Sequence, residues 1–281
     1  MGGYNLKSHG HSLCIPLSIS LILFLLLNKV NSTQPQSFNF VDFEPGDEDL
    51  IFQNDAYVTP SGVLHLTKVD QNGTPIKNSI GRALFADPIQ IWDSTTNKVA
   101  SFQTRFTFSI NQTHRFGADG LAFFMAPTNT KPAQGGGFLG LFNTSEDDKS
   151  SQILAIEFDT FQNSFDSGHV PHIGIDVNSI RSIKSHYFYL DNEEVANVSI
   201  TYDASSKILH AAIVYPSVGI VYQVAEIVDL KEVLSERVLI GFSASTGQGS
   251  QTHHVHSWSF SASFPGINNG IATLDHNTLQ S

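Results

Sequence analysis

Cysteine is almost absent from this sequence of 281 residues, because its single example, Cys14, lies in an apolar N-terminal segment. If that segment is removed, the mature chain has no disulfide and needs a large core, bound metal or association for stability. Long hydrophobic runs are lacking further on, since no later segment approaches 18 consecutive apolar residues. We therefore predict a soluble mature product without a membrane span.

The N-terminal segment has the pattern of a secretory signal. Lys7 provides a positive start, and a largely apolar region of 13 residues, Ile15 to Leu27, follows it. That run is too short for a comfortable membrane span, and Val30 and Ser32 are suitable residues before a cleavage point. We predict that residues 1–32 are a signal peptide, and that the protein passes through the secretory pathway to an extracellular or vacuolar location.

Basic residues are also scarce. Lys and Arg number 15 against 26 Asp and Glu, which gives a formal net charge of −11. Removal of Lys7 and Lys29 with the signal makes the mature chain more acidic. Such a chain has no basic stripe for phosphate groups, so nucleic acid and anionic membranes are not expected as partners.

Helical patterns are nearly missing, and strand patterns take their place. Phe102, Phe106, Phe108 and Ile110 alternate with polar residues, and short alternating segments separated by turn signals recur to residue 264. Only Asp229–Ser235 has a helical pattern, of one or two turns. We predict an all-β antiparallel jelly-roll sandwich over residues 33–264, followed by a flexible tail at 265–281.

The segment AIEFDTFQNSFD, residues 155–166, places acids in an apolar context. Glu157 and Asp159 share one strand face. Crowded carboxylates need a cation, shared protons or solvent. Shared protons would suit a glycoside hydrolase on the same sandwich. However, the third acid of the Glu-x-Asp-x-Glu type run is missing, because residues 161–163 are Phe, Gln and Asn.

Metal ions account for more of these residues. An all-oxygen set suits Ca²⁺, and a mixed carboxylate and imidazole set suits Mn²⁺ or another transition ion. The calcium set comprises Asp159, the Phe161 carbonyl, Asn163 and Asp166; the transition-metal set comprises Glu157, Asp159, Asp166 and His172.

The segments EFDTFQNSFD and HIGIDVNSI together resemble the metal-binding signature of the legume lectins. The blocks GRALFADPIQIWD, ADGLAFFMAP, GGGFLGLFN and HSWSFSA extend the resemblance through nearly the whole mature chain. It implies a concanavalin A-like sandwich that binds carbohydrate without catalysis and holds Ca²⁺ and Mn²⁺ at the residues named above, with Ser182 holding a metal-bound water. The glycans would be its partners, and we expect a single-chain homodimer, with a tetramer as the alternative.

The resemblance also implies roles at the sugar. Asp119 would accept hydrogen bonds from sugar hydroxyls, after a cis peptide bond to Ala118. The backbone N–H of Gly137 and the side-chain amide of Asn163 would donate, and Phe161 would pack on the ring. Gln248 and Gly249 would face the ligand from a variable specificity loop.

The sugar class follows from the same resemblance. The spacing between Gly247 and Trp258 equals that of the mannose/glucose group typified by pea and lentil lectins. We therefore predict mannose/glucose-type glycans. Because Gln248-Gly249-Ser250 replaces the acidic or small residues often found in this loop, galactose-type and N-acetylglucosamine ligands stay open.

Two further features are weaker. His253, His254 and His256 lack acidic or cysteine partners in sequence, so we predict exposed strand histidines, with His256 on the face of Trp258. Four sequons are candidate glycosylation sites, at Asn72, Asn111, Asn143 and Asn197.

Overall fold

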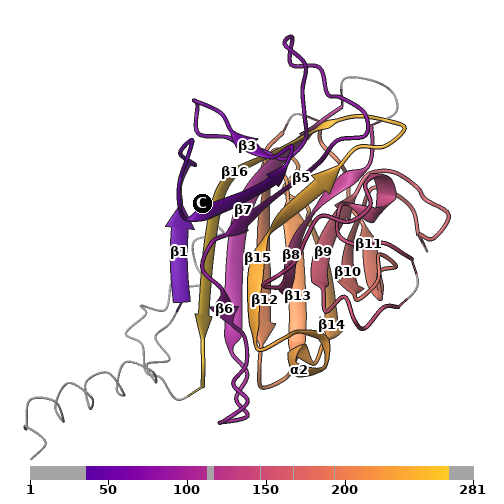
Figure 1. Ribbon diagram of the computed structural model, residues 1–281. Helices are drawn as coiled ribbons and strands as arrows, with labels where there is room; N and C mark the ends of the chain where they lie inside the picture. Colours follow the sequence, from indigo (N-terminus) through magenta and orange to yellow (C-terminus); the bar gives the residue numbers. More distant parts are fainter. Residues whose placement is uncertain (1–35, 113–116, 146, 167, 193, 266–281) are drawn as a thin grey trace, which may run out of the picture. The chain divides into compact units, whose positions relative to one another are not determined.

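A computed structural model describes residues 36–112, 117–145, 147–166, 168–192 and 194–265 (Figure 1). These residues belong to one compact unit. The predicted signal peptide, residues 1–32, and the predicted tail after Pro265 lie outside the described residues. Among the described residues, no helix is long and apolar enough to cross a membrane.

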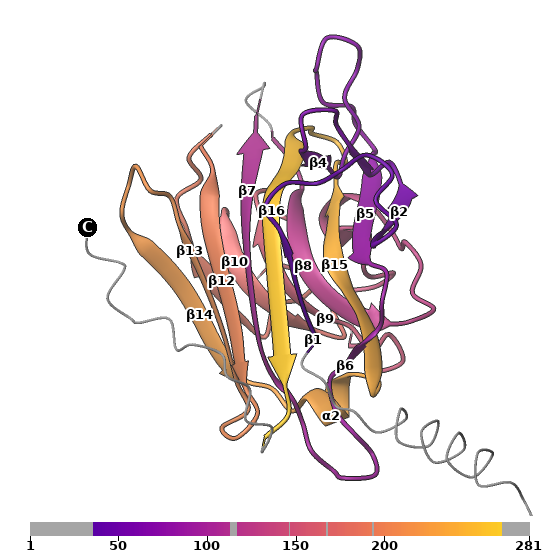
Figure 2. The same cartoon turned by 90° about the vertical axis from the view of Figure 1, so that its left-hand side faces the viewer.

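Two antiparallel sheets make up the fold, as the alternating patterns predict. The first sheet runs β14-β13-β12-β7-β16-β4-β3, with β1 also pairing to β16, and Figure 2 faces it. Its strands are β1 (Gln36–Phe40), β3 (Tyr57–Val58), β4 (Leu64–His65), β7 (Ser101–Asn111), β12 (Ala196–Asp203), β13 (Ile208–Val214), β14 (Val221–Ile227) and β16 (Thr252–Ser263).

The second sheet runs β11-β10-β9-β8-β15-β5-β2, with β6 also pairing to β15. Neighbours in both sheets are often far apart in sequence, as in a jelly roll. The strands of the second sheet are β2 (Leu50–Asn54), β5 (Ile80–Phe85), β6 (Ile89–Gln90), β8 (Gly120–Pro127), β9 (Leu154–Asp159), β10 (His172–Val177), β11 (Lys184–Tyr187) and β15 (Arg237–Ser245).

The main core lies between the two sheets. On β12, Val198 and Ile200 point into it, while Asn197 is exposed on the other face. On β9, Ile156 and Phe158 join this core, but Ala155 belongs to a second, smaller apolar cluster. That second core covers the outer face of the second sheet with Leu139, Leu141 and Phe142, among others. Consequently Glu157 and Asp159, which share the face of Ala155, are buried too.

Short helical turns complete the structure. The four-residue helix α2 (Leu230–Val233) falls inside the predicted segment, and the side chain of Asp229 caps it by accepting from the Lys231 N–H. The 3₁₀ turn η1 (Gly136–Phe138) lies in the glycine-rich loop between β8 and β9.

The prediction for the β16 histidines was wrong in two respects. A β-bulge between Val255 and Ser257 inserts His256, so Val255 and Trp258 both face the core and His256 does not share the Trp258 face. His256 instead hydrogen-bonds the Ser109 hydroxyl through Nε2, at 2.9 Å. The three histidines are not exposed: His253 is fully buried, and His254 and His256 are half-buried. An alternating pattern cannot reveal a bulge, because the inserted residue changes the phase.

Candidate functional site

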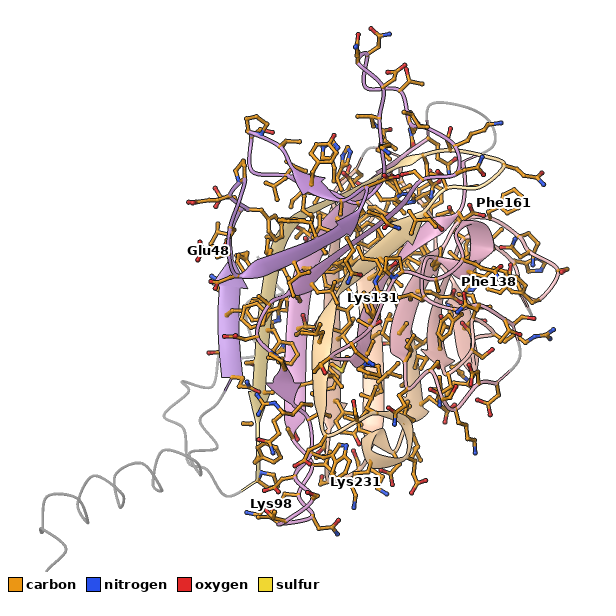
Figure 3. All side chains as sticks on the ribbon, viewed as in Figure 1. Glu48, Lys98, Lys131, Phe138, Phe161 and Lys231 are labelled. Carbon is orange, nitrogen blue, oxygen red and sulfur yellow. The ribbon has the colours of Figure 1, made fainter. Side chains whose placement is uncertain are left out.

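A cavity of about 380 Å³ opens among loops that begin or end at strands of the second sheet. Five of the six predicted sugar-binding residues line it. One of the five, Gln248, comes from the specificity loop, residues 246–251, which joins β15 to β16. Gly249 is buried and does not line the cavity. Figure 3 shows Phe161 and Phe138 on the same side of the molecule in that view. The lining residues are Asn78, Ile80, Asp119, Gly135, Gly136, Gly137, Phe161, Asn163, Thr246, Gly247 and Gln248.

Asp119 lies just before β8 and is fixed through its backbone. Its N–H donates to the Ser245 carbonyl at 3.0 Å, and its carbonyl accepts from the Thr160 N–H at 2.8 Å. The peptide bond from Ala118 is cis, as the resemblance implied. The carboxylate oxygen Oδ2 is buried without a hydrogen-bond partner. Burial, helped by the negative charge of Asp166, raises the pKa of Asp119 to about 7.

The glycine-rich loop is held against β15 by two hydroxyl groups. Ser245 Oγ donates to the Gly136 carbonyl at 2.6 Å, and Ser243 Oγ donates to the Leu139 carbonyl at 2.5 Å. At Gly137 a Cβ would lie 2.2 Å from Asn163 Oδ1. The backbone of Gly137 can therefore reach the Asn163 amide only because residue 137 has no side chain.

Phe161 and Asn163 lie on the loop after β9, which folds around its own carboxylates. The Phe161 N–H donates to Asp159 Oδ1 at 2.7 Å, and the Asn163 N–H donates to Asp166 Oδ2 at 2.5 Å. Asn163 Oδ1 is buried without a hydrogen-bond partner. Both side chains thus face the cavity from a loop whose backbone is tied to acids.

Beneath this loop three of the four predicted transition-metal ligands meet, whereas Asp166 is not part of the group. Glu157, Asp159 and His172 offer ligand atoms that all lie within 4.8 Å of one another. The antiparallel register places His172 opposite Asp159 and Gly174 opposite Glu157. Ser182 Oγ donates to Glu157 Oε1 at 2.5 Å, so the predicted water-holding residue also lies at this cluster.

Asp176 is a member of the cluster that sequence reasoning missed. It is fully buried, and Ser182 Oγ lies 2.8 Å from its Oδ1, while its Oδ2 has no hydrogen-bond partner. A signal existed, because His172, Gly174 and Asp176 alternate along β10 and therefore share a face. Asn78, Ile80 and Thr246 of the cavity wall carried no comparable signal.

The cluster holds more negative charge than its surroundings offset. Burial raises the pKa of Asp159 and Asp176, and the nearby charge of Glu157 adds to both shifts. Burial lowers the pKa of His172, but its hydrogen bond to Glu157 and the negative charges of Glu157 and Asp166 together outweigh this, so the net shift of the pKa is upward. His172 Nδ1 is a further buried atom without a partner. Carboxylates, one imidazole and unpaired oxygens form a donor set that fits divalent cations.

Comparison with known proteins agrees with this geometry. A family model described as the legume lectin domain matches residues 35–275. The chain belongs to the legume lectin family. It is 58% identical over 276 residues to a lectin of Erythrina corallodendron, covering 96% of this chain and 98% of that protein.

Solved legume lectin structures share the fold. The basic winged bean lectin with Tn-antigen has a TM-score of 0.78 and 52% identity, covering 83% of this chain and all of that one. The winged bean acidic lectin complexed with methyl-α-D-galactose has a TM-score of 0.77 and 49% identity, covering 82% and 99%. The similar proteins are named lectins and agglutinins, which bind carbohydrate without catalysis. This legume lectin is accordingly a carbohydrate-binding protein and not an enzyme.

The predicted glycosylation sites are all among the described residues. Asn72, Asn143 and Asn197 are exposed. Asn111, at the end of β7, is half-buried, and its Oδ1 is enclosed without a hydrogen-bond partner. The first three side chains are therefore better placed for attachment of a glycan than Asn111.

Proposed function

We propose that the cavity binds a monosaccharide at the end of a glycan. The observation that carries this is the convergence of one acceptor, two donors and one aromatic face. Asp119 offers a carboxylate, Gly137 an N–H, Asn163 an amide and Phe161 a ring. Vicinal hydroxyl groups require this combination, because each hydroxyl both donates and accepts while the C–H face of the sugar is apolar.

Ca²⁺ and Mn²⁺ are the cations we propose. Asp159, Asn163, Asp166 and the Phe161 carbonyl would hold the calcium ion; Glu157, Asp159, Asp166 and His172 would hold the manganese ion, with Ser182 beside it. The ions would neutralise the buried acids and keep Asp119 charged. The chain's own contribution is then to hold Asn163 and Phe161 in place, since their loop is tied to Asp159 and Asp166.

For the sugar class we propose mannose/glucose-type glycans. Support comes from the specificity loop, whose short span sets the Gly247-to-Trp258 spacing of that group. Within residues 248–251 only Gln248 lines the cavity, and the next three residues are buried. Galactose-type binding is the second candidate, because the winged bean acidic lectin is complexed with methyl-α-D-galactose.

Isothermal titration with methyl α-mannoside and methyl α-galactoside separates the two candidates, since the sugars differ in the orientation of the C2 and C4 hydroxyls. We expect the mannoside to bind at least tenfold more tightly, and EDTA followed by dialysis to abolish binding. Tighter galactoside binding would replace the first candidate with the second. Full binding by demetallated protein would overturn the proposed role of the ions.

The cellular setting is also a proposal. A cleaved signal of residues 1–32 would bring the chain into the secretory pathway, where exposed sequons can be glycosylated. Assembly into a homodimer would raise avidity for glycans that carry several copies of the sugar. N-terminal sequencing of the purified protein tests the cleavage point, and light scattering tests the assembly.

A further inference from the structure

A buried chain of hydrogen bonds links the specificity loop to Asp119. Gln251, the last residue of that loop, is fully buried, and its Nε2 donates to Thr160 Oγ1 at 2.7 Å. Thr160 Oγ1 in turn donates to the Asp119 carbonyl at 2.8 Å. Because Thr160 lies between Asp159 and Phe161, this chain touches the backbone of the sugar acceptor and of the aromatic platform together.

The direction of every hydrogen bond follows from the chemistry of the groups. The Gln251 Nε2 can only donate, so His253 Nε2, which lies 2.9 Å away, must accept. The neutral His253 then carries its proton on Nδ1 and donates to Thr67 Oγ1 at 3.0 Å. The Thr67 hydroxyl points back to the Gln251 carbonyl at 3.4 Å, which closes a ring.

The remaining atom of the Gln251 amide is also satisfied. Its Oε1 accepts from Gln112 Nε2 at 3.3 Å. The Gln112 side chain fills the space beside Gly117, where a Cβ would lie 2.4 Å from it. Gln112 therefore contacts the segment that leads into Asp119 from its other side. A fully satisfied buried polar network of this kind allows one arrangement of its members, because each shift leaves a donor or acceptor unpaired.

We propose that Gln251 and Thr160 are positioning residues for sugar binding, which fix the specificity loop, Asp119 and Phe161 relative to one another. Neither side chain lines the cavity, so they act through the groups that do. The inference rests on the proposed sugar site, but it does not depend on which sugar is bound. Loss of either side chain would leave the acceptor and the loop free to move independently.

The experiment measures sugar affinity in metal-saturated wild-type protein and in Q251L, T160V and T160S, using whichever methyl glycoside the wild type prefers. We expect Q251L and T160V to bind at least tenfold more weakly with unchanged metal stoichiometry. T160S keeps the hydroxyl and should stay within about threefold of the wild type.

A matched control removes another buried threonine hydroxyl, in the first sheet. Thr104 Oγ1 donates to the Ser259 carbonyl and accepts from Trp258 Nε1, so T104V loses two similar hydrogen bonds. We expect T104V to lower the Tm without changing sugar affinity. The Tm of all four variants is measured, because a merely structural role would lower the Tm and leave affinity intact.

The outcomes separate the two proposals. Wild-type affinity in both Q251L and T160V would overturn the positioning role while leaving the sugar site standing. Weaker binding that tracks a loss of bound metal, and is restored by excess Ca²⁺ and Mn²⁺, would also overturn it. A wild-type protein that binds neither glycoside would overturn the proposed function itself.

Discussion

Replacing Gly137 by alanine should weaken sugar binding without unfolding the protein. The new Cβ would lie 2.2 Å from Oδ1, 2.5 Å from Cγ and 2.8 Å from Nδ2 of Asn163, so the amide must move away. Gly137 has no positive φ, so the backbone tolerates alanine. The substitution therefore acts on the Asn163 side chain and on the distance between the sugar and the N–H of residue 137.

The magnitude follows from the hydrogen bonds that would be lost. Two neutral donors contribute about 1 kcal/mol each, so their loss amounts to about 2 kcal/mol. That free energy corresponds to a dissociation constant for the sugar that is roughly 30-fold larger. Isothermal titration of the metal-loaded variant measures it, with circular dichroism to verify the fold.

A second glycine serves as the matched control. Gly168 lies on the loop between β9 and β10, which also carries Asn163. A Cβ at Gly168 would meet only Ser185 Oγ at 3.7 Å, which is an ordinary contact. G168A should therefore bind sugar like the wild type. If G137A also bound like the wild type while folded and metal-loaded, the assignment of Gly137 and Asn163 as donors would be refuted.

Three other substitutions test the metal cluster, the buried histidine and the core. In G174A the Cβ would lie 2.0 Å from Ser182 Oγ and 2.7 Å from Glu157 Oε1, so we expect at least tenfold weaker Mn²⁺ binding by titration; unchanged affinity would contradict the cluster geometry. Burial lowers the pKa of His253 to about 3, below its unfolded value of 6.5, so its stabilising effect is present above pH 6.5 and falls as the pH drops towards 3. Between pH 7 and pH 5 the resulting loss of unfolding free energy is about 2 kcal/mol. Urea denaturation should therefore show that metal-free wild type loses about 2 kcal/mol more than metal-free H253Q over this pH range. Equal losses would argue against a buried neutral imidazole. Phe158 is fully buried and its ring lies 4.9 Å from that of Phe108; F158A should cost about 3–5 kcal/mol of unfolding free energy, and a cost below about 1 kcal/mol would place Phe158 outside the core.

Local patterns predicted much of the fold. The predicted alternation is observed residue by residue along β12, residues 196–203, because the inward residues are buried in the core and the residues between them are more exposed. The crowding of Glu157 and Asp159 was visible because strand side chains alternate strictly. The segment resemblance then added Asp119 and Gly137, which no local pattern would have joined to β9.

Features that depend on contacts distant in sequence were missed. His253 is buried because Gln251 and Thr67 satisfy its nitrogens, and Thr67 is 186 residues away along the chain. The bulge at His256 depends on pairing with β7, which the sequence of β16 alone does not contain. Gly249 was expected at the ligand from its place in the loop, but the turn after Gln248 carries it inward.

The second apolar core has a consequence for the order in which parts of the protein unfold. Leu139, Leu141 and Phe142 cover the same face of the second sheet that carries Glu157 and Asp159. The loop layer therefore rests partly on apolar side chains and partly on acids that repel one another, whereas the core between the two sheets is mainly apolar. Chelation should loosen the outer layer first, seen as faster amide exchange at residues 136–142 while β7 and β12 stay protected. The β-sandwich would then stay folded without metal, and only the loop layer over the second sheet would depend on the bound ions for its order.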